Sequence, residues 1–491
     1  MKSVASTGLD GLDTLIDGLH RGDNVVWRVD DLEEYRLFVR AVVDSAAKKL
    51  PEPVDLVYLR FAQHPPLFTT TEKDQWRITE ISLPLDHGFE FFITAVHRQI
   101  VEHGERAVLV FDSLSDLSQR YYSDRMIGNF FQLTCPLILR TGSVAYFSLE
   151  RFFHSFHTVE PITETTQILI DVFRHEDQVY LQPVKLEGRD PQSAFTLFQW
   201  EPGGRFTPVT ASAAIVPVLN TRPWPGLRSA SYRMVGVWDR AFLDAETRLR
   251  EVEAGRVPGA LAEEKKEQLL QLIVSREERV LSLARQHLSL ADVVRVWKRM
   301  VGTGYIGGKS VGMLLARAIL ARGEQRWREI MEEHDSFFVG SDVYYTFLVI
   351  NDCWWERQRH KDPTGFLENN AAVRTRMLNG RFPGYVIDRF MDMLDYYGTS
   401  PIIVRSSSLL EDNFGNAFAG KYDSVFCTMQ GTREERLEEF LSAVRRIYAS
   451  TISDDALAYR KKRGILDQDE QMALLVQRVS GDRYESESGG R

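Results

Sequence analysis

Residues 401–424, PIIVRSSSLLEDNFGNAFAGKYDS, give the clearest indication of how the second half of the chain folds. The apolar run Pro401–Val404 predicts a short buried strand, and Arg405 and three serines follow it directly. An arginine can pair with phosphate oxygens through two parallel hydrogen bonds, and serine hydroxyls can donate others. Taken alone, Arg405 could equally form a salt bridge at the end of its strand. The stretch therefore predicts either an anion site or a paired strand end.

A glycine-rich stretch lies upstream of this strand, at residues 301–310, VGTGYIGGKS. Glycines allow the backbone to approach an anion, a helix N-terminus favours negative charge, and Lys309 adds a cation. The stretch misses the pattern G-x-x-x-x-G-K-[ST], because its first glycine position falls on Thr303. A glycine turn without a ligand is the alternative. The helix after Ser310 is expected to bury Val311, Leu314, Leu315, Ala318 and Ile319.

The two stretches together resemble the ATP-grasp nucleotide-binding domain of phosphoenolpyruvate synthase and pyruvate phosphate dikinase. IGGKSVGML, VRSSSLLEDNFGNAFAGKYDSV, AYRKKRGI and MALLVQRV follow in the family's order across about residues 300–480. The resemblance implies ATP as the ligand, with Lys309 and Arg405 on its phosphates. It further implies an ATP site lined by Gly307, Gly308, Ser406, Ser407, Gly420 and Ser424, with Gln477 and Val479 near the adenine.

The sequence also departs from this family. The family's magnesium ligands, phosphohistidine domain and pyruvate-binding barrel are not found in the 491 residues. The resemblance therefore implies Mg²⁺ as a cofactor, although the family's ligands for it are not found in this sequence. No metal-binding or catalytic residue is assigned. We expect an ATP-binding, phosphotransferase-like protein, with a partner or separate chain supplying the histidine domain. The alternative is a non-catalytic regulatory or scaffold protein with a vestigial nucleotide site.

The first 205 residues alternate short apolar runs with helical stretches, which is typical of an α/β domain. The first runs are continuously apolar, which predicts a sheet covered on both faces, and the later ones predict antiparallel strands at an edge. The predicted strands are Asn24–Val29, Val54–Leu59, Ala107–Asp112, Pro136–Arg140, Ser143–Ser148, Gln167–Phe173 and Gln178–Val184.

Two segments of this half resemble the RecA/KaiC-like ATPase family: STGLDGLDTLIDGLHRGDNVVWRV at 6–29 and VLVFDSLSDL at 108–117. The resemblance covers about residues 6–185 and implies that Asp112 is the Walker B aspartate. The strand ending at Val29 is followed by Asp-Asp-Leu-Glu-Glu instead of a glycine loop with a lysine. These carboxylates would repel a triphosphate by several kcal/mol. We therefore expect a degenerate RecA-like domain that senses, docks or oligomerises and does not hydrolyse ATP; Asp112 is then an ordinary polar residue at a strand end.

Length and composition set the remaining expectations. The 60 Lys and Arg against 69 Asp and Glu give a net charge of −9, which argues against nucleic acid as a partner. No apolar run approaches the ~20 residues of a membrane span, the N-terminus lacks a signal-peptide core, and three scattered cysteines suit the cytoplasm. The sequence does not decide whether the chain forms an oligomer.

We expect four segments along the chain. A RecA/KaiC-like domain spans residues 1–205, and a linker with a helical hairpin spans 206–290. The hairpin turns at Gly255–Gly259. An incomplete ATP-grasp α+β domain spans 291–480, and a flexible tail spans 481–491.

Overall fold

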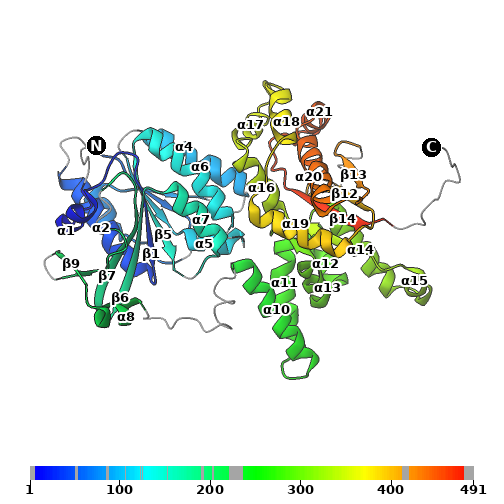
Figure 1. Cartoon of the computed structure of the whole chain (residues 1–491), viewed down its shortest axis with the longest axis horizontal. Helices are drawn as coiled ribbons and strands as arrows, with labels where there is room; N and C mark the ends of the chain where they lie inside the picture. Colours follow the sequence, from blue (N-terminus) through cyan, green and yellow to red (C-terminus); the bar gives the residue numbers. More distant parts are fainter. Residues whose placement is uncertain are drawn as a thin grey trace. The chain divides into compact units, whose positions relative to one another are not determined.

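The chain folds into two compact units, Met1–Arg240 and Ala241–Arg491 (Figure 1). The computed structural model describes residues 6–49, 54–62, 64–83, 88–104, 107–121, 123, 125–151, 153–189, 193–201, 204–219, 236–411 and 420–479. Each unit combines helices with one sheet, so the predicted mixed α/β fold class is confirmed. The predicted tail lies outside the described residues.

The first unit contains a nine-stranded sheet in the order β3-β2-β4-β5-β1-β6-β7-β8-β9. Strands β3 to β6 in this order are parallel, and β7, β8 and β9 continue the sheet in antiparallel pairing. The predicted antiparallel edge is therefore confirmed. The strands are β1 (Asn24–Val29), β2 (Leu56–Arg60), β3 (Thr79–Ser82), β4 (Val108–Asp112), β5 (Val144–Glu150), β6 (Ile168–His175), β7 (Gln178–Leu186), β8 (Phe198–Trp200) and β9 (Phe206–Pro208).

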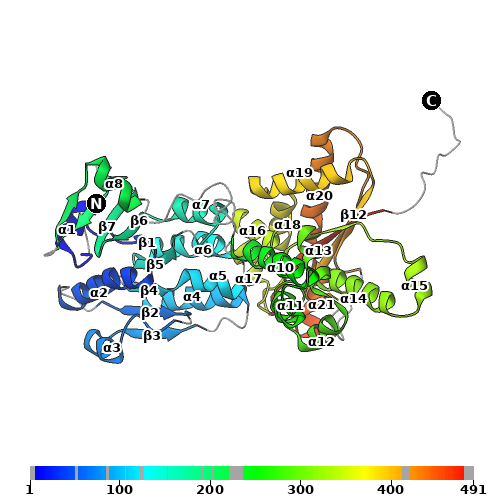
Figure 2. The same cartoon turned by 90° about the horizontal axis from the view of Figure 1, so that it is seen from below.

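Helices cover both faces of this sheet, α1 and α2 on one side and α4 to α7 on the other (Figures 1 and 2). Helix α8 follows β9 and packs Val218 against Phe173 and Leu197. The helices of this unit are α1 (Asp10–Ile16), α2 (Leu32–Lys49), α3 (Thr70–Trp76), α4 (Phe89–His103), α5 (Leu114–Tyr121), α6 (Arg125–Thr141), α7 (Phe156–Thr165) and α8 (Ser212–Leu219).

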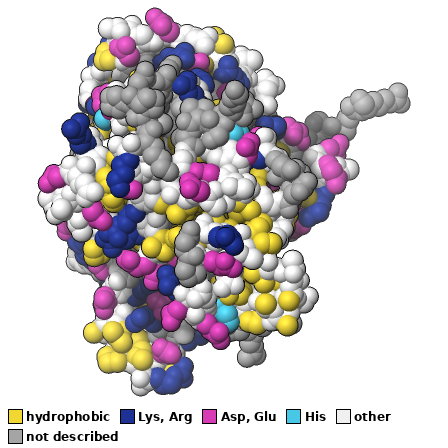
Figure 3. All heavy atoms as spheres, turned by 90° about the vertical axis from the view of Figure 1, so that its left-hand side faces the viewer, with side chains coloured by type: hydrophobic (Ala, Val, Ile, Leu, Met, Phe, Trp, Pro, Cys, Tyr) yellow, Lys and Arg dark blue, Asp and Glu magenta, His cyan; other side chains and the backbone are white. Residues whose placement is uncertain are grey.

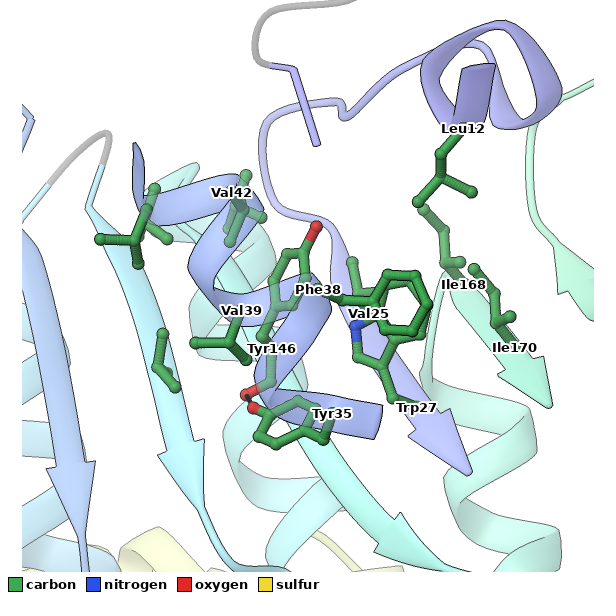
Figure 4. Close-up of a cluster of buried hydrophobic side chains, with 14 of the residues drawn as sticks. Leu12, Val25, Trp27, Tyr35, Phe38, Val39, Val42, Tyr146, Ile168 and Ile170 are labelled. Carbon is green, nitrogen blue, oxygen red and sulfur yellow. Dashed lines mark hydrogen bonds between the residues drawn. The ribbon is translucent and has the colours of Figure 1, made fainter. Parts of the chain in front are cut away.

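The core of the first unit lies on both sides of the sheet. Between the sheet and α2, Trp27 stacks on Phe38 with ring centroids 4.1 Å apart (Figure 4). On the opposite face, Phe111 stacks on Phe147 at 4.4 Å, and Phe130 packs edge-on against Phe111. Burial on both faces explains why these strands are continuously apolar in the sequence.

One predicted strand is wrong. Residues 136–140 lie inside helix α6, although the run Pro-Leu-Ile-Leu looks like a buried strand. Phe131, Cys135 and Ile138 are buried with helical spacing, so this apolar run forms the inner face of a helix. A short apolar run cannot distinguish a strand from a buried helix segment by periodicity alone.

The acidic segment after β1 caps helix α2. The Asp31 carboxylate accepts a hydrogen bond from the Glu33 amide (3.0 Å), and the Glu34 carboxylate accepts one from the Asp31 amide (2.8 Å). A helix N-terminus normally attracts an anion because its first amides lack partners. In α2 the chain's own carboxylates take that place.

Two arginines neutralise the same segment. Arg151 pairs with Asp30 (2.6 Å), and Arg174 pairs with Glu34 (3.0 Å). The charges that opposed a triphosphate in the sequence argument are thus committed to contacts within the unit.

Asp112 is fully buried at the end of β4 and forms an ion pair with His64 (Nε2 to Oδ1, 2.7 Å). The Tyr58 hydroxyl donates to the other carboxylate oxygen, and His64 Nδ1 lies 2.7 Å from the Pro65 carbonyl oxygen. The hydrogen bond to Asp112 raises the pKa of His64. Both imidazole nitrogens therefore have acceptors, which favours the charged ring.

We predict that this pair makes stability depend on pH. Because the folded pKa of His64 exceeds its unfolded value of about 6.5, the stabilisation is complete below that value and is lost as pH rises through the folded pKa. Thermal unfolding of the full chain between pH 6 and pH 9 should show this loss. The His64→Gln variant should not show it, and the His175→Gln control should behave as wild type. Parallel curves for wild type and His64→Gln would contradict the prediction.

The second unit contains a five-stranded sheet in the order β10-β11-β14-β12-β13. Strands β10 and β11 are parallel and the other pairs antiparallel. The strands are β10 (Met300–Val301), β11 (Ser336–Val339), β12 (Ile402–Ser408), β13 (Ser424–Cys427) and β14 (Met472–Arg478).

The helices of the second unit include the predicted hairpin, α10 and α11, separated by residues 254–258. Helix α10 crosses the boundary between the units in the sequence. The helices are α10 (Val237–Glu253), α11 (Gly259–Ile273), α12 (Glu278–His287), α13 (Leu290–Lys298), α14 (Gly308–Arg322), α15 (Gln325–Ile330), α16 (Ser341–Ile350), α17 (Trp354–Arg359), α18 (Asn370–Leu378), α19 (Gly384–Tyr397), α20 (Arg433–Ser450) and α21 (Asp454–Arg463).

Helix α14 buries less of its apolar face than expected. Val311 and Leu315 are buried, whereas Leu314 and Ala318 are half-buried and Ile319 is 44% exposed. The prediction for Ile319 is therefore wrong, because spacing identifies residues that share a face and not whether another element covers it.

The surface and the cysteines bear on the remaining expectations. The face drawn in Figure 3 intersperses Lys and Arg with Asp and Glu side chains, with apolar groups between them. Within the described part of the chain, no helix combines the length and apolarity that crossing a bilayer requires.

Cys135, Cys353 and Cys427 are buried free thiols, and burial raises the pKa of Cys427 to about 12. Two expectations from the sequence stay predictions: that the chain does not bind nucleic acid, and that it is located in the cytoplasm.

Candidate functional site

The glycine-rich loop and the end of β12 touch through their backbones. Gly307 has φ +78°, and a Cβ atom there would lie 1.4 Å from the Ser407 carbonyl oxygen. A Cβ on Gly308 would lie 2.1 Å from the Glu411 carbonyl oxygen. Only glycine allows this approach, so the two motifs that were predicted to share a site are in direct contact.

Ser407 holds the start of α14 against β12. Its hydroxyl donates to the Ile306 carbonyl (2.8 Å) and accepts from the Ser310 amide (3.0 Å). Among the described residues, the amides of Gly308 and Lys309 have no hydrogen-bond acceptor. These two amides lie at the positive end of a fifteen-residue helix and can donate to an anion.

Lys309 lies in a compact polar cluster at the same place. Its ammonium donates to Ser406 Oγ (2.9 Å) and Glu411 Oε1 (2.6 Å). The lysine side chain is 24% exposed and that of Glu411 only 2%. The second oxygen of Glu411 accepts from the Ser408 amide (2.9 Å). Lys309 is therefore already paired with a buried carboxylate.

Burial raises the pKa of Glu411, and the Lys309 ammonium and the serine hydrogen bonds offset part of that rise. The Lys309 ammonium is therefore the cation that compensates for part of the desolvation of Glu411.

Arg405 lies on the other face of β12 from Ser406, because successive side chains of a strand alternate. It is half-buried, and among the described residues its guanidinium has no hydrogen bond or ion pair. The exposed Ser424 pairs with it across β13 and lies on the same face. Gln477 pairs with Ile403 on this face as well, and donates to Met313 Sδ of α14 (3.3 Å).

The predicted site residues therefore form two groups. Lys309 and Ser406 meet beside Glu411, whereas Arg405, Ser407, Ser424 and Gln477 share the other face of the sheet. Ser407 contacts the glycine loop and the start of α14 from that face. Lys309 contacts Ser406 and Glu411, and the convergence of Lys309 and Arg405 on one nucleotide stays a prediction.

Val479 directly follows β14, whereas Gly420 lies in the loop four residues before β13. Gly420 has φ +71°, and no described residue beyond its neighbours in the chain lies within 4 Å of the position of a Cβ atom there. The Val479 amide donates to the Pro401 carbonyl (3.0 Å). Their predicted roles at the ATP site, like those of Gly307 and Gly308, stay predictions.

Sequence reasoning missed the role of Glu411. Its only signal in the sequence is its place three residues after Ser408, within the stretch that resembles the dikinase family. It also missed Phe426, which is 68% exposed on β13 and pairs with Ile403 on the face that carries Arg405. The alternation of apolar and polar residues in a four-residue strand is too short to reveal such a side chain.

A second buried carboxylate braces the end of β12. Glu470 accepts from the hydroxyls of Ser408 and Tyr422 and pairs with Arg460 (3.1 Å). The side chains of Glu470 and Arg460 are 0% exposed. Within the described part of the chain, no group of three His, Cys, Asp or Glu residues could hold a metal ion.

Comparison with protein families identifies this region. Residues 303–490 match the family model of the pyruvate phosphate dikinase AMP/ATP-binding domain. This dikinase-type region includes every predicted ATP-site residue, and the suspected resemblance is confirmed. The matched region is less than half of the chain. The match supports nucleotide binding by this region.

Two further comparisons concern the whole chain. Comparison with curated proteins gives no match. Among solved structures, the chain is similar to the KaiC-like protein PH0186 from the hyperthermophilic archaeon Pyrococcus horikoshii OT3. The alignment covers 42% of this chain and 98% of that chain, with 14% sequence identity and a TM-score of 0.34.

We predict that Gly307→Ala disrupts the junction of loop and strand in the dikinase-type region. A Cβ atom cannot fit against the Ser407 carbonyl, and the positive φ is strained for alanine, so unfolding should become easier by about 3 kcal/mol. Urea unfolding of the full chain measures this. Gly312→Ala is the matched control, because Gly312 is exposed inside α14 with open space around it and alanine favours the helix. Equal stability of the two variants would contradict the prediction.

Proposed function

We propose that the second unit binds ATP between the glycine loop and the face of the sheet that carries Arg405. The single observation that carries this proposal is the contact of Gly307 with Ser407. That contact places the N-terminus of α14, with two amides that have no acceptor among the described residues, at the end of the arginine strand. The match to an AMP/ATP-binding domain supports the same assignment.

The chemistry of a triphosphate fits these groups. The Gly308 and Lys309 amides donate to phosphate oxygens, and Arg405 supplies a guanidinium that no described residue neutralises. Gln477 and Phe426 lie on the same face, about one strand repeat from Arg405, where a base attached to those phosphates would lie. Magnesium would enter with the nucleotide, held by the phosphates and water.

As its activity we propose a phosphotransferase of the phosphoenolpyruvate synthase type, in which another chain supplies the histidine that accepts the phosphoryl group. The first unit then has a sensing, docking or oligomerising role. The capping of α2 by Asp31 and Glu34 supports its inability to hold a triphosphate.

A second candidate is a non-catalytic regulatory protein with a vestigial nucleotide site. The ion pair between Lys309 and Glu411 favours it, because it neutralises the cation on which phosphate binding would depend. Incubation of the chain with labelled ATP separates the two functions. Release of AMP, or transfer of label to an added histidine-domain partner or to the chain itself, excludes the non-catalytic candidate.

We predict that Lys309→Ala weakens ATP binding at least tenfold, a loss of about 1.4 kcal/mol, because it removes a charge from the phosphate end. Arg405→Ala should weaken it tenfold or more, because it removes a charge-assisted pair. Calorimetric titration with ATP measures both. Lys462→Ala, which removes an exposed lysine of α21, should bind as wild type. Unchanged affinity in both site variants would overturn the assignment.

A further inference from the structure

The buried ion pair of Lys309 and Glu411 poses a problem for nucleotide entry. Lys309 has three N–H donors, and two of them contact Ser406 and Glu411. A triphosphate that recruits this ammonium draws it away from a carboxylate that is 2% exposed. Glu411 would then be a buried anion without its cation, next to the phosphate charges.

Among the described residues around Glu411, no other cation is placed to take over the role of Lys309. Ser406 and Ser408 of β12 contribute only neutral donors. Tyr422 precedes β13 and stays a neutral phenol, because burial and Glu470 raise its pKa well above the ordinary value. Arg460 of α21 is fully buried and pairs with Glu470. A buried carboxylate without a cation destabilises the protein by several kcal/mol. Such a group therefore takes up a proton and becomes neutral.

We propose that Glu411 is a positioning residue that holds Lys309 in the empty site and releases it to an entering nucleotide by taking up a proton from solvent. The inference rests on the proposed ATP binding. Two contacts of the carboxyl group can persist in this step, the one with Ser406 in the reverse direction. A protonated Glu411 can donate to Ser406 Oγ while its other oxygen still accepts from the Ser408 amide. No bond other than that of the proton to the carboxylate is formed.

The direction of the pH effect follows from linkage. Burial already raises the pKa of Glu411 in the empty site, and loss of Lys309 together with the arrival of phosphates raises it further. Binding therefore takes up protons, and ATP affinity falls as pH rises between the two pKa values of this carboxyl.

The test is calorimetric titration of the full chain with ATP at pH 8, in buffers of different ionisation enthalpy. At this pH the phosphate's own second pKa, about 6, contributes little. The wild type should take up a measurable fraction of a proton per ATP. Glu411→Gln should take up almost none, and its affinity should not vary with pH. Glu438→Gln, which alters an exposed pair with Arg445, should behave as wild type.

A second variant keeps the proposal testable if Glu411→Gln does not fold. Lys309→Met removes the partner of Glu411 from the empty site, so the carboxyl is already protonated and ATP binding should take up no proton. ATP binding by the wild type without proton uptake, or uptake retained in either variant, overturns the role of Glu411 and leaves the proposed function intact. No ATP binding by the wild type overturns both.

Discussion

The site of the second unit depends on one close contact, that of the Gly307 backbone with the Ser407 carbonyl. Because nothing larger than a hydrogen fits between them, α14 begins directly against the end of β12. Ser407 then holds the first turn of the helix, and Lys309 reaches Ser406 and Glu411. The two helix amides and the cluster around Lys309 lie at this junction, which belongs to the dikinase-type region.

The local features of this site could be predicted from the sequence, and its long-range features could not. An apolar run before Arg405 and a glycine turn before a helix are encoded in neighbouring residues. The pairing of Lys309 with Glu411 joins residues 102 positions apart, and no periodicity indicates it. The same limit explains the strand wrongly predicted at 136–140 and the exposed Ile319. In both cases the residues are apolar, but the sequence does not show which element or surface they pack against.

The two units differ in whether the charged side chains at their strand ends are paired with other described residues. In the first unit, Asp112 is paired with His64 and Asp30 with Arg151, so the carboxyl ends of the central strands are internally neutralised. In the second unit, Lys309 is neutralised by Glu411, while Arg405 has no partner among the described residues. A guanidinium without a partner among the described residues retains its capacity to bind an anion.

The three buried thiols have a practical consequence for work on this chain. A thiol reacts as its thiolate, and burial keeps Cys353 and Cys427 almost entirely protonated at neutral pH, with pKa values raised to about 11 and about 12. Maleimide dyes should therefore label the folded chain slowly. Two cysteines introduced on exposed helices of one unit can carry a donor and an acceptor fluorophore without first replacing the native ones, so a distance within that unit becomes measurable by energy transfer.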